Sequence, residues 1–164
     1  MEIKERYHYF LDPQTLLTAF MEPAYHLEKY QYTGAKDIEV LECGQDGDVF
    51  RVRSRRTEHI DVPKMASGLL SDTIVILQTD EWVMGEGNHV MGSYELAIEG
   101  TPMATHGEMV IRPHANGSEL EITILAIVKI PIIGKQLAKL LVGDIKKSLA
   151  LEYEFEMEYL KKWL

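Results

Sequence analysis

The stretch that most constrains the fold is "AIVKIPIIGKQLAKLL", residues 126–141. A run of strand-type residues is cut by Pro131 and Gly134, and a helical pattern then continues almost to the C-terminus. A helix over residues 133–163 is on the order of 45 Å long, whereas a strand of eight to ten residues spans about 30 Å. We therefore ask which surface so long a helix covers. Its apolar side carries Leu137, Leu141, Ile145, Leu149, Phe155, Tyr159 and Trp163.

The chain before this helix predicts one strand, two short helices and then six strands. Residues 3–10 alternate with the period of a strand, and Asp12-Pro13 is a typical N-cap and first helical position. Pro23 ends or restarts the helix, and Gly34 closes a second one. From residue 36 the period changes to two, and short joints rich in Gly and Asp predict an antiparallel meander. The six strands are expected at 36–43, 47–56, 73–83, 89–99, 104–113 and 118–130.

This order predicts an α+β fold in a single domain, residues 1–164: a curved seven-stranded antiparallel sheet around a long C-terminal helix. A wide sheet twists and curls, and a straight helix cannot follow a curved surface along its whole length. We therefore expect a wedge-shaped cavity where the two part. The segment 62–72, with its single helical turn, and the segment 129–135 are both placed to gate it. Ile130, Ile132 and Ile133 either form an apolar lip or plug the end of the sheet.

Composition excludes several classes of function. The formal net charge of −9 argues against nucleic acid, whose binding depends on Lys and Arg. The basic stretch "RVRSRR" at 51–56 is expected on the solvated face of a strand. The only cysteine, Cys43, cannot form an internal disulfide, which favours a cytoplasmic location. No apolar stretch approaches the roughly 20 residues of a spanning helix, and the N-terminus lacks the apolar core of a signal peptide.

The element order and the stretch "FLDPQTLLTAFMEPAY" resemble the START-like (SRPBCC, helix-grip) superfamily. The ending "VKIPIIGKQLAKLLVGDIKKSLALEYEF" is similar to one uncharacterised bacterial branch of it, a domain of unknown function. The resemblance implies a hydrophobic pocket between sheet and terminal helix. Members bind sterols, phospholipids, polyketides or plant hormones, some are cyclases or dehydratases, and others act through protein contacts. Fold alone does not choose among these activities.

Candidate ligand-binding residues follow from strand alternation and from the apolar helix face, although most such residues simply fill a core. Tyrosine and tryptophan are favoured because a buried hydroxyl or indole N–H needs a partner, which the polar end of a cavity supplies. The candidates are Tyr7, Tyr9, Phe50, Val52, Ile76, Trp82, Tyr94, Met109, Ile124, Leu137, Leu141, Ile145 and Glu152.

Glu152 lies near the middle of the apolar helix face, and a carboxylate is rarely buried there without a partner. It is either a paired structural residue or a polar anchor or general acid/base at the end of the cavity. Asp144 and Ser148 are weaker candidates on the same side.

The chain contains no motif for a resident metal or cofactor. None of its six histidines forms the His-x-x-x-His pair of a helical zinc site, and phosphate-binding glycine motifs and a nucleophile elbow are missing. We therefore expect no cofactor and no metal. Three functions remain: a carrier of a small apolar molecule (lipid-like or polyketide-like), a cyclase, dehydratase or isomerase that uses Glu152 with a tyrosine, and a protein-interaction module with a filled core.

Overall fold

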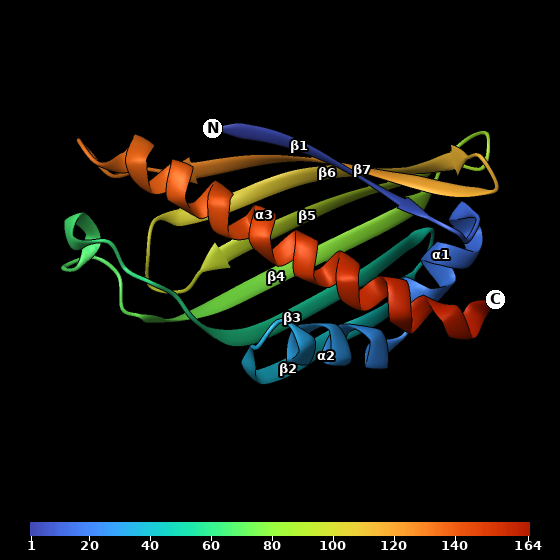
Figure 1. Cartoon of the computed structure of the whole chain (residues 1–164), viewed down its shortest axis with the longest axis horizontal. Coiled ribbons are helices and arrows are strands. Elements are labelled where there is room, and N and C mark those ends of the chain that lie inside the picture. Colours follow the sequence, from blue (N-terminus) through green and yellow to red (C-terminus); the bar gives the residue numbers. More distant parts are fainter.

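The computed structural model describes all residues, 1–164, and Figure 1 shows its two layers. The helical layer consists of α1 (Pro13–Phe20), α2 (Pro23–Tyr32) and α3 (Gly134–Tyr159), which the short 3-10 turn η2 (Leu160–Trp163) continues. A second 3-10 turn, η1 (Lys64–Ala66), lies in the connection between the third and fourth strands. The sheet consists of β1 (Glu2–Tyr9), β2 (Lys36–Asp46), β3 (Val49–His59), β4 (Thr73–Met84), β5 (Val90–Ile98), β6 (Met103–His114) and β7 (Gly117–Val128).

All seven strands form one antiparallel sheet in the order β1-β7-β6-β5-β4-β3-β2. The first strand therefore lies beside the last, while β2 to β7 follow one another as a meander. α3 crosses one face of the curved sheet diagonally, and α1 and α2 lie near the C-terminal end of α3 (Figure 1). The predicted α+β helix-grip architecture is confirmed.

The helix boundaries follow from local chemistry that the sequence displays. Asp12 caps α1 by accepting hydrogen bonds from the Thr15 backbone N–H at 3.0 Å and from its hydroxyl at 2.9 Å. Gly34 follows α2 with a φ of +93°, a left-handed conformation that glycine adopts without strain. α3 ends slightly earlier than expected, because its last residues tighten into η2.

The core lies between the sheet and the helical layer. Strand alternation holds on the inner face, where Phe50, Val52, Ile76, Trp82 and Tyr94 are buried. On α3, Leu137, Leu141 and Ile145 are buried, and Leu149, Phe155 and Tyr159 pack against the same core, as does Trp163 on η2. The sequence pattern therefore predicted the buried face of the sheet and of the long helix.

Candidate functional site

A cavity remains between α3 and the sheet. About 150 Å³ of it is open to the centre of a water-sized sphere. Because one water needs roughly 10–15 Å³ on this measure, the space corresponds to on the order of ten waters. Of the 31 residues that line it, 21 are hydrophobic, so the cavity suits an apolar guest.

Ten of the thirteen predicted ligand-binding residues line this cavity. Phe50, Val52 and Ile124 do not: they are buried in the surrounding core at 4%, 2% and 0% exposure. Strand alternation identifies the face on which a residue lies, but it does not separate the wall of a cavity from the packed core beside it. The ten are Tyr7, Tyr9, Ile76, Trp82, Tyr94, Met109, Leu137, Leu141, Ile145 and Glu152.

Two cross-strand glycines determine where the cavity aromatics lie. Trp82 pairs with Gly92 across β4 and β5, and Tyr94 pairs with Gly107 across β5 and β6. A Cβ at Gly92 would lie 2.5 Å from the indole ring, and one at Gly107 would overlap the Tyr94 ring. Each ring therefore lies flat over a glycine on the next strand. The Tyr94 hydroxyl also lies 3.0 Å from Thr105 Oγ1, which fixes its direction.

Most of the charged side chains that line the cavity lie around Lys29 on α2, and we call this part of the cavity its polar end. Asp144 lines the cavity two turns before Glu152 on α3. The Lys29 ammonium lies 3.8 Å from Glu152 Oε1 and within 5 Å of the ring centroids of Tyr25 and Tyr30. Burial acts against the ammonium, but Tyr30 and the nearby carboxylates offset it, so the pKa of Lys29 is raised. The Lys29 ammonium donates no hydrogen bond to a protein group, and its nearest carboxylate oxygen is the one on Glu152. Its N–H donors are therefore free to bond a guest.

A chain of hydrogen bonds continues from β3 to β4 beside Lys29. The Arg56 guanidinium donates to Glu58 at 3.2 Å and to Gln78 at 3.0 Å, and Gln78 donates to Asp80 at 3.0 Å. Arg56 also lies 4.0 Å above the Tyr30 ring. Burial raises the pKa of Asp80, while Lys29, Gln78 and Arg56 act in the opposite direction. These bonds hold two of the charged groups that line the cavity, Arg56 and Asp80, in place.

Glu156 is the most perturbed carboxyl group of the cavity. It is 6% exposed, and the Tyr9 hydroxyl donates to its Oε2 at 3.2 Å. Burial raises its pKa to about 7, and neighbouring Glu152 adds to the rise against the opposing effect of Lys29. Glu156 therefore holds its proton to higher pH than an ordinary glutamate does. Burial also raises the pKa of Glu152, although Lys29 and Arg56 oppose this.

His26 adds an acceptor to the same end. Its Nε2 donates to the Phe20 carbonyl at 2.7 Å, and its Nδ1 has no protein partner. Burial lowers the pKa of His26 to about 3, so the ring is neutral and Nδ1 keeps its lone pair.

Sequence reasoning missed most of this polar end. The expectation that residues 51–56 form a solvated face is wrong for Arg56, which is 5% exposed. Arg56 lies on the same inward face of β3 as Val52, and Asp80 lies on the same inward face of β4 as Trp82. A polar residue at an inward-facing strand position was therefore the available signal. Lys29 and His26 gave no such signal, because the face that α2 turns inward depends on how the helix docks.

The two segments predicted to gate the cavity, residues 62–72 and 129–135, both lie at one end of the molecule (Figure 1). Ile60 and Leu70, beside η1, line the cavity. Ile132 is 99% exposed with a φ of +74°, whereas Ile130 and Ile133 are half-buried against the core. None of the three isoleucines lines the cavity, so their role as a lip or a plug stays a prediction. None of the helices combines the length and apolar character needed to cross a bilayer.

Comparisons with solved structures support the fold. The protein TTHA0849 from Thermus thermophilus is 18% identical with a TM-score of 0.61, covering 98% of this chain and 99% of its own. A protein from Mycobacterium smegmatis described as a START superfamily protein is 17% identical with a TM-score of 0.55, at 98% and 99% coverage. Protein Ms6760 from M. smegmatis is 6% identical with a TM-score of 0.61, at 99% and 92% coverage. At these identities the likeness concerns the fold alone.

Sequence comparison places the chain in a family. No curated protein matches it. The model of the family described as "Protein of unknown function (DUF2505)" matches residues 4–160, almost the whole chain. The chain therefore belongs to the DUF2505 family and has the START-like helix-grip fold.

Proposed function

We propose that this chain binds a small, largely apolar molecule in the cavity beneath α3. The observation that carries the proposal is the cavity itself, an apolar space with most of its charged groups gathered around Lys29. A lipid-like or polyketide-like compound has this distribution of polarity. The cavity also argues against the interaction module with a filled core. A cytoplasmic location, predicted from the lone Cys43, is part of the proposal.

The polar end favours a neutral acceptor on the guest. Lys29 offers unused N–H donors, which suit a carbonyl or hydroxyl oxygen. The two buried cations, Lys29 and Arg56, are already outnumbered by the carboxylates of Glu58, Asp80 and Glu152. An added carboxylate would meet repulsion in a poorly solvated site. We therefore expect uncharged guests to bind better than their carboxylate analogues.

Thermal unfolding with a matched pair of small aromatics tests this proposal. At 100 times its dissociation constant a ligand adds about 2.7 kcal/mol, which raises the Tm of a domain this size by roughly 5–10 °C. Naphthol is expected to give such a shift and naphthoate a smaller one. No shift in Tm with these two compounds or with a wider panel of apolar compounds, together with no small molecule retained in native mass spectrometry, would exclude the carrier function.

An enzyme is the second candidate, and Glu156 is the specific observation that favours it. A carboxyl group with a pKa of about 7, hydrogen-bonded to the Tyr9 hydroxyl and near Glu152, has the properties of a general acid or base. A cyclase, dehydratase or isomerase would use these groups on the bound molecule. Turnover of a bound compound that is lost in Glu156→Gln, with binding retained, would identify the chain as an enzyme rather than a carrier.

A further inference from the structure

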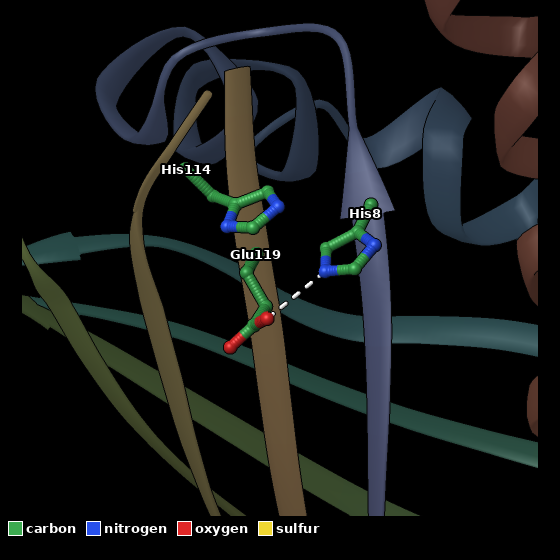
Figure 2. Close-up of side chains that lie close together, drawn as sticks. All are labelled: His8, His114 and Glu119. Carbon is green, nitrogen blue, oxygen red and sulfur yellow. Dashed lines mark hydrogen bonds and ion pairs between the residues drawn. The ribbon is translucent and has the colours of Figure 1, made fainter. Parts of the chain in front are cut away.

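A second cluster of ligand-type side chains lies on the outer face of the sheet, away from the cavity. His8 on β1, His114 at the end of β6 and Glu119 on β7 come together because β7 lies between the other two strands. His8 pairs directly with Glu119 across β1 and β7. The donor atoms of all three residues lie within 4.8 Å of one another (Figure 2).

We propose that His8, His114 and Glu119 form a binding site for a divalent transition-metal ion of the zinc type. Two imidazoles and one carboxylate are a common three-ligand set for Zn²⁺, with a further position left to water or another ligand. A shallow hollow lined by His8, His114, Phe10 and Asn116 adjoins the cluster. This hollow leaves room for that further ligand.

Glu119 is already oriented for such a role. Its Oε1 accepts a hydrogen bond from the Arg112 guanidinium at 3.1 Å, which fixes the carboxylate and leaves Oε2 for the ion. Oε2 lies 2.9 Å from His8 Nε2 (Figure 2). A bound ion would replace the proton between these two atoms, and His8 would carry its proton on Nδ1 instead.

Binding requires one imidazole to turn. The His8 and His114 rings are stacked, with centroids 4.3 Å apart and planes 5° from parallel. A metal ion lies in the plane of each imidazole that binds it, so two stacked parallel rings cannot share an ion. His114 is exposed and makes no side-chain hydrogen bond, so little opposes its rotation. The ligand atoms already lie within 4.8 Å of one another, so rotation of the His114 side chain is the motion that would bring them around one ion.

The sequence predicted no metal site because that expectation rested on spacing within one helix or on cysteine clusters. Glu119 is 111 residues from His8 and 5 residues from His114, and the three meet only through strand pairing. The chain also offers a matched control: His106 Nδ1 lies 3.7 Å from Glu95 Oε1 on the exposed outer face, with no second histidine.

Calorimetric titration of the untagged protein with Zn²⁺ alone tests the site. We expect one ion per chain, unchanged affinity in His106→Ala, and affinity at least about tenfold weaker in His8→Ala, His114→Ala and Glu119→Gln. All four positions lie on the surface of the sheet, and circular dichroism would verify that the variants fold. No saturable binding, or equal losses in His106→Ala and His114→Ala, would overturn the proposal.

A second readout separates a built site from scattered histidine binding. Co²⁺ bound by two imidazoles and a carboxylate in four-coordinate geometry absorbs visible light much more strongly than the hydrated ion. This band is expected in the wild type and in His106→Ala, and it is expected to vanish in His114→Ala. A band that persists in His114→Ala would contradict the assignment.

Discussion

Charged side chains inside the molecule dominate its behaviour at the residue scale. Lys29, Arg56, Asp80, Glu152 and Glu156 all line one cavity, where transfer from water costs each charge several kcal/mol unless it is compensated. Lys29 and Arg56 compensate the carboxylates only in part, since the pKa values of Asp80, Glu152 and Glu156 are all raised. This arrangement weakens the fold at high pH and leaves titratable groups facing the guest.

Glu156 predicts a defined pH dependence. Its pKa rises from about 4.5 to about 7 on folding, so the native state holds the proton more tightly, and stability falls as pH rises through this window. Glu156→Gln mimics the protonated form. When the pH is raised from 5 to 8, the free energy of unfolding of Glu156→Gln should therefore increase relative to that of the wild type by roughly 2 kcal/mol. Urea denaturation at both pH values measures this gain.

Glu154→Gln on the exposed side of α3 is the control, and we expect no such pH-dependent gain from it. A difference between Glu156→Gln and wild type that stays constant with pH would show that Glu156 is ionised throughout.

Glu152→Gln separates an anchor from a structural ion pair. Because the pKa of Glu152 is raised, its burial outweighs its attraction to Lys29 and Arg56. We therefore expect unchanged or slightly higher stability at pH 8, together with an altered affinity for naphthol. Loss of stability with unchanged affinity would identify Glu152 as a structural partner of Lys29. If both quantities stay unchanged, the assignment of Glu152 to the site is wrong.

At the scale of elements, the positions of the cavity aromatics depend on strand pairing with glycine. Trp82 over Gly92 and Tyr94 over Gly107 use the space that a missing Cβ leaves on the adjacent strand. The rings are thereby held against the sheet and do not fill the cavity.

Gly107→Ala should displace the Tyr94 ring and lower the free energy of unfolding by about 1–3 kcal/mol, as expected for overpacking. Gly143→Ala on α3 meets no atom within 4 Å and should instead stabilise the chain by roughly 0.5–1 kcal/mol. Denaturant unfolding of both variants measures these effects. Two changes of the same sign would refute the role given to Gly107.

The elements were largely predictable from the sequence, whereas the site was predictable only in part. Asp12-Pro13, Gly34 and the period-two strands are local signals, and the structure confirms them. The polar end of the cavity depends on which face α2 docks and on polar residues at inward strand positions. Arg56 and Asp80 gave that second signal, and Lys29 gave none. The His8–Glu119 pair requires β1 to lie beside β7, which local patterns do not specify.

At the scale of the whole molecule, the proposed binding function depends on imperfect packing between a curved sheet and a straight helix. A cavity that is truly empty accepts extra bulk. Leu96 lines the cavity, so Leu96→Trp places a larger side chain in it. This variant should therefore change the free energy of unfolding by less than about 1 kcal/mol, whereas overpacking a filled core costs about 1–3 kcal/mol. Leu125→Trp, on the exposed outer face of β7, is the matched control for denaturant unfolding.

Calorimetric titration of naphthol into the wild type, Leu96→Trp and Leu125→Trp tests the central claim most directly. We expect one saturable site per chain in the wild type and in Leu125→Trp, with affinity at least tenfold weaker in Leu96→Trp (about 1.4 kcal/mol). Equal binding by all three proteins, or saturable binding in none of them, would contradict it.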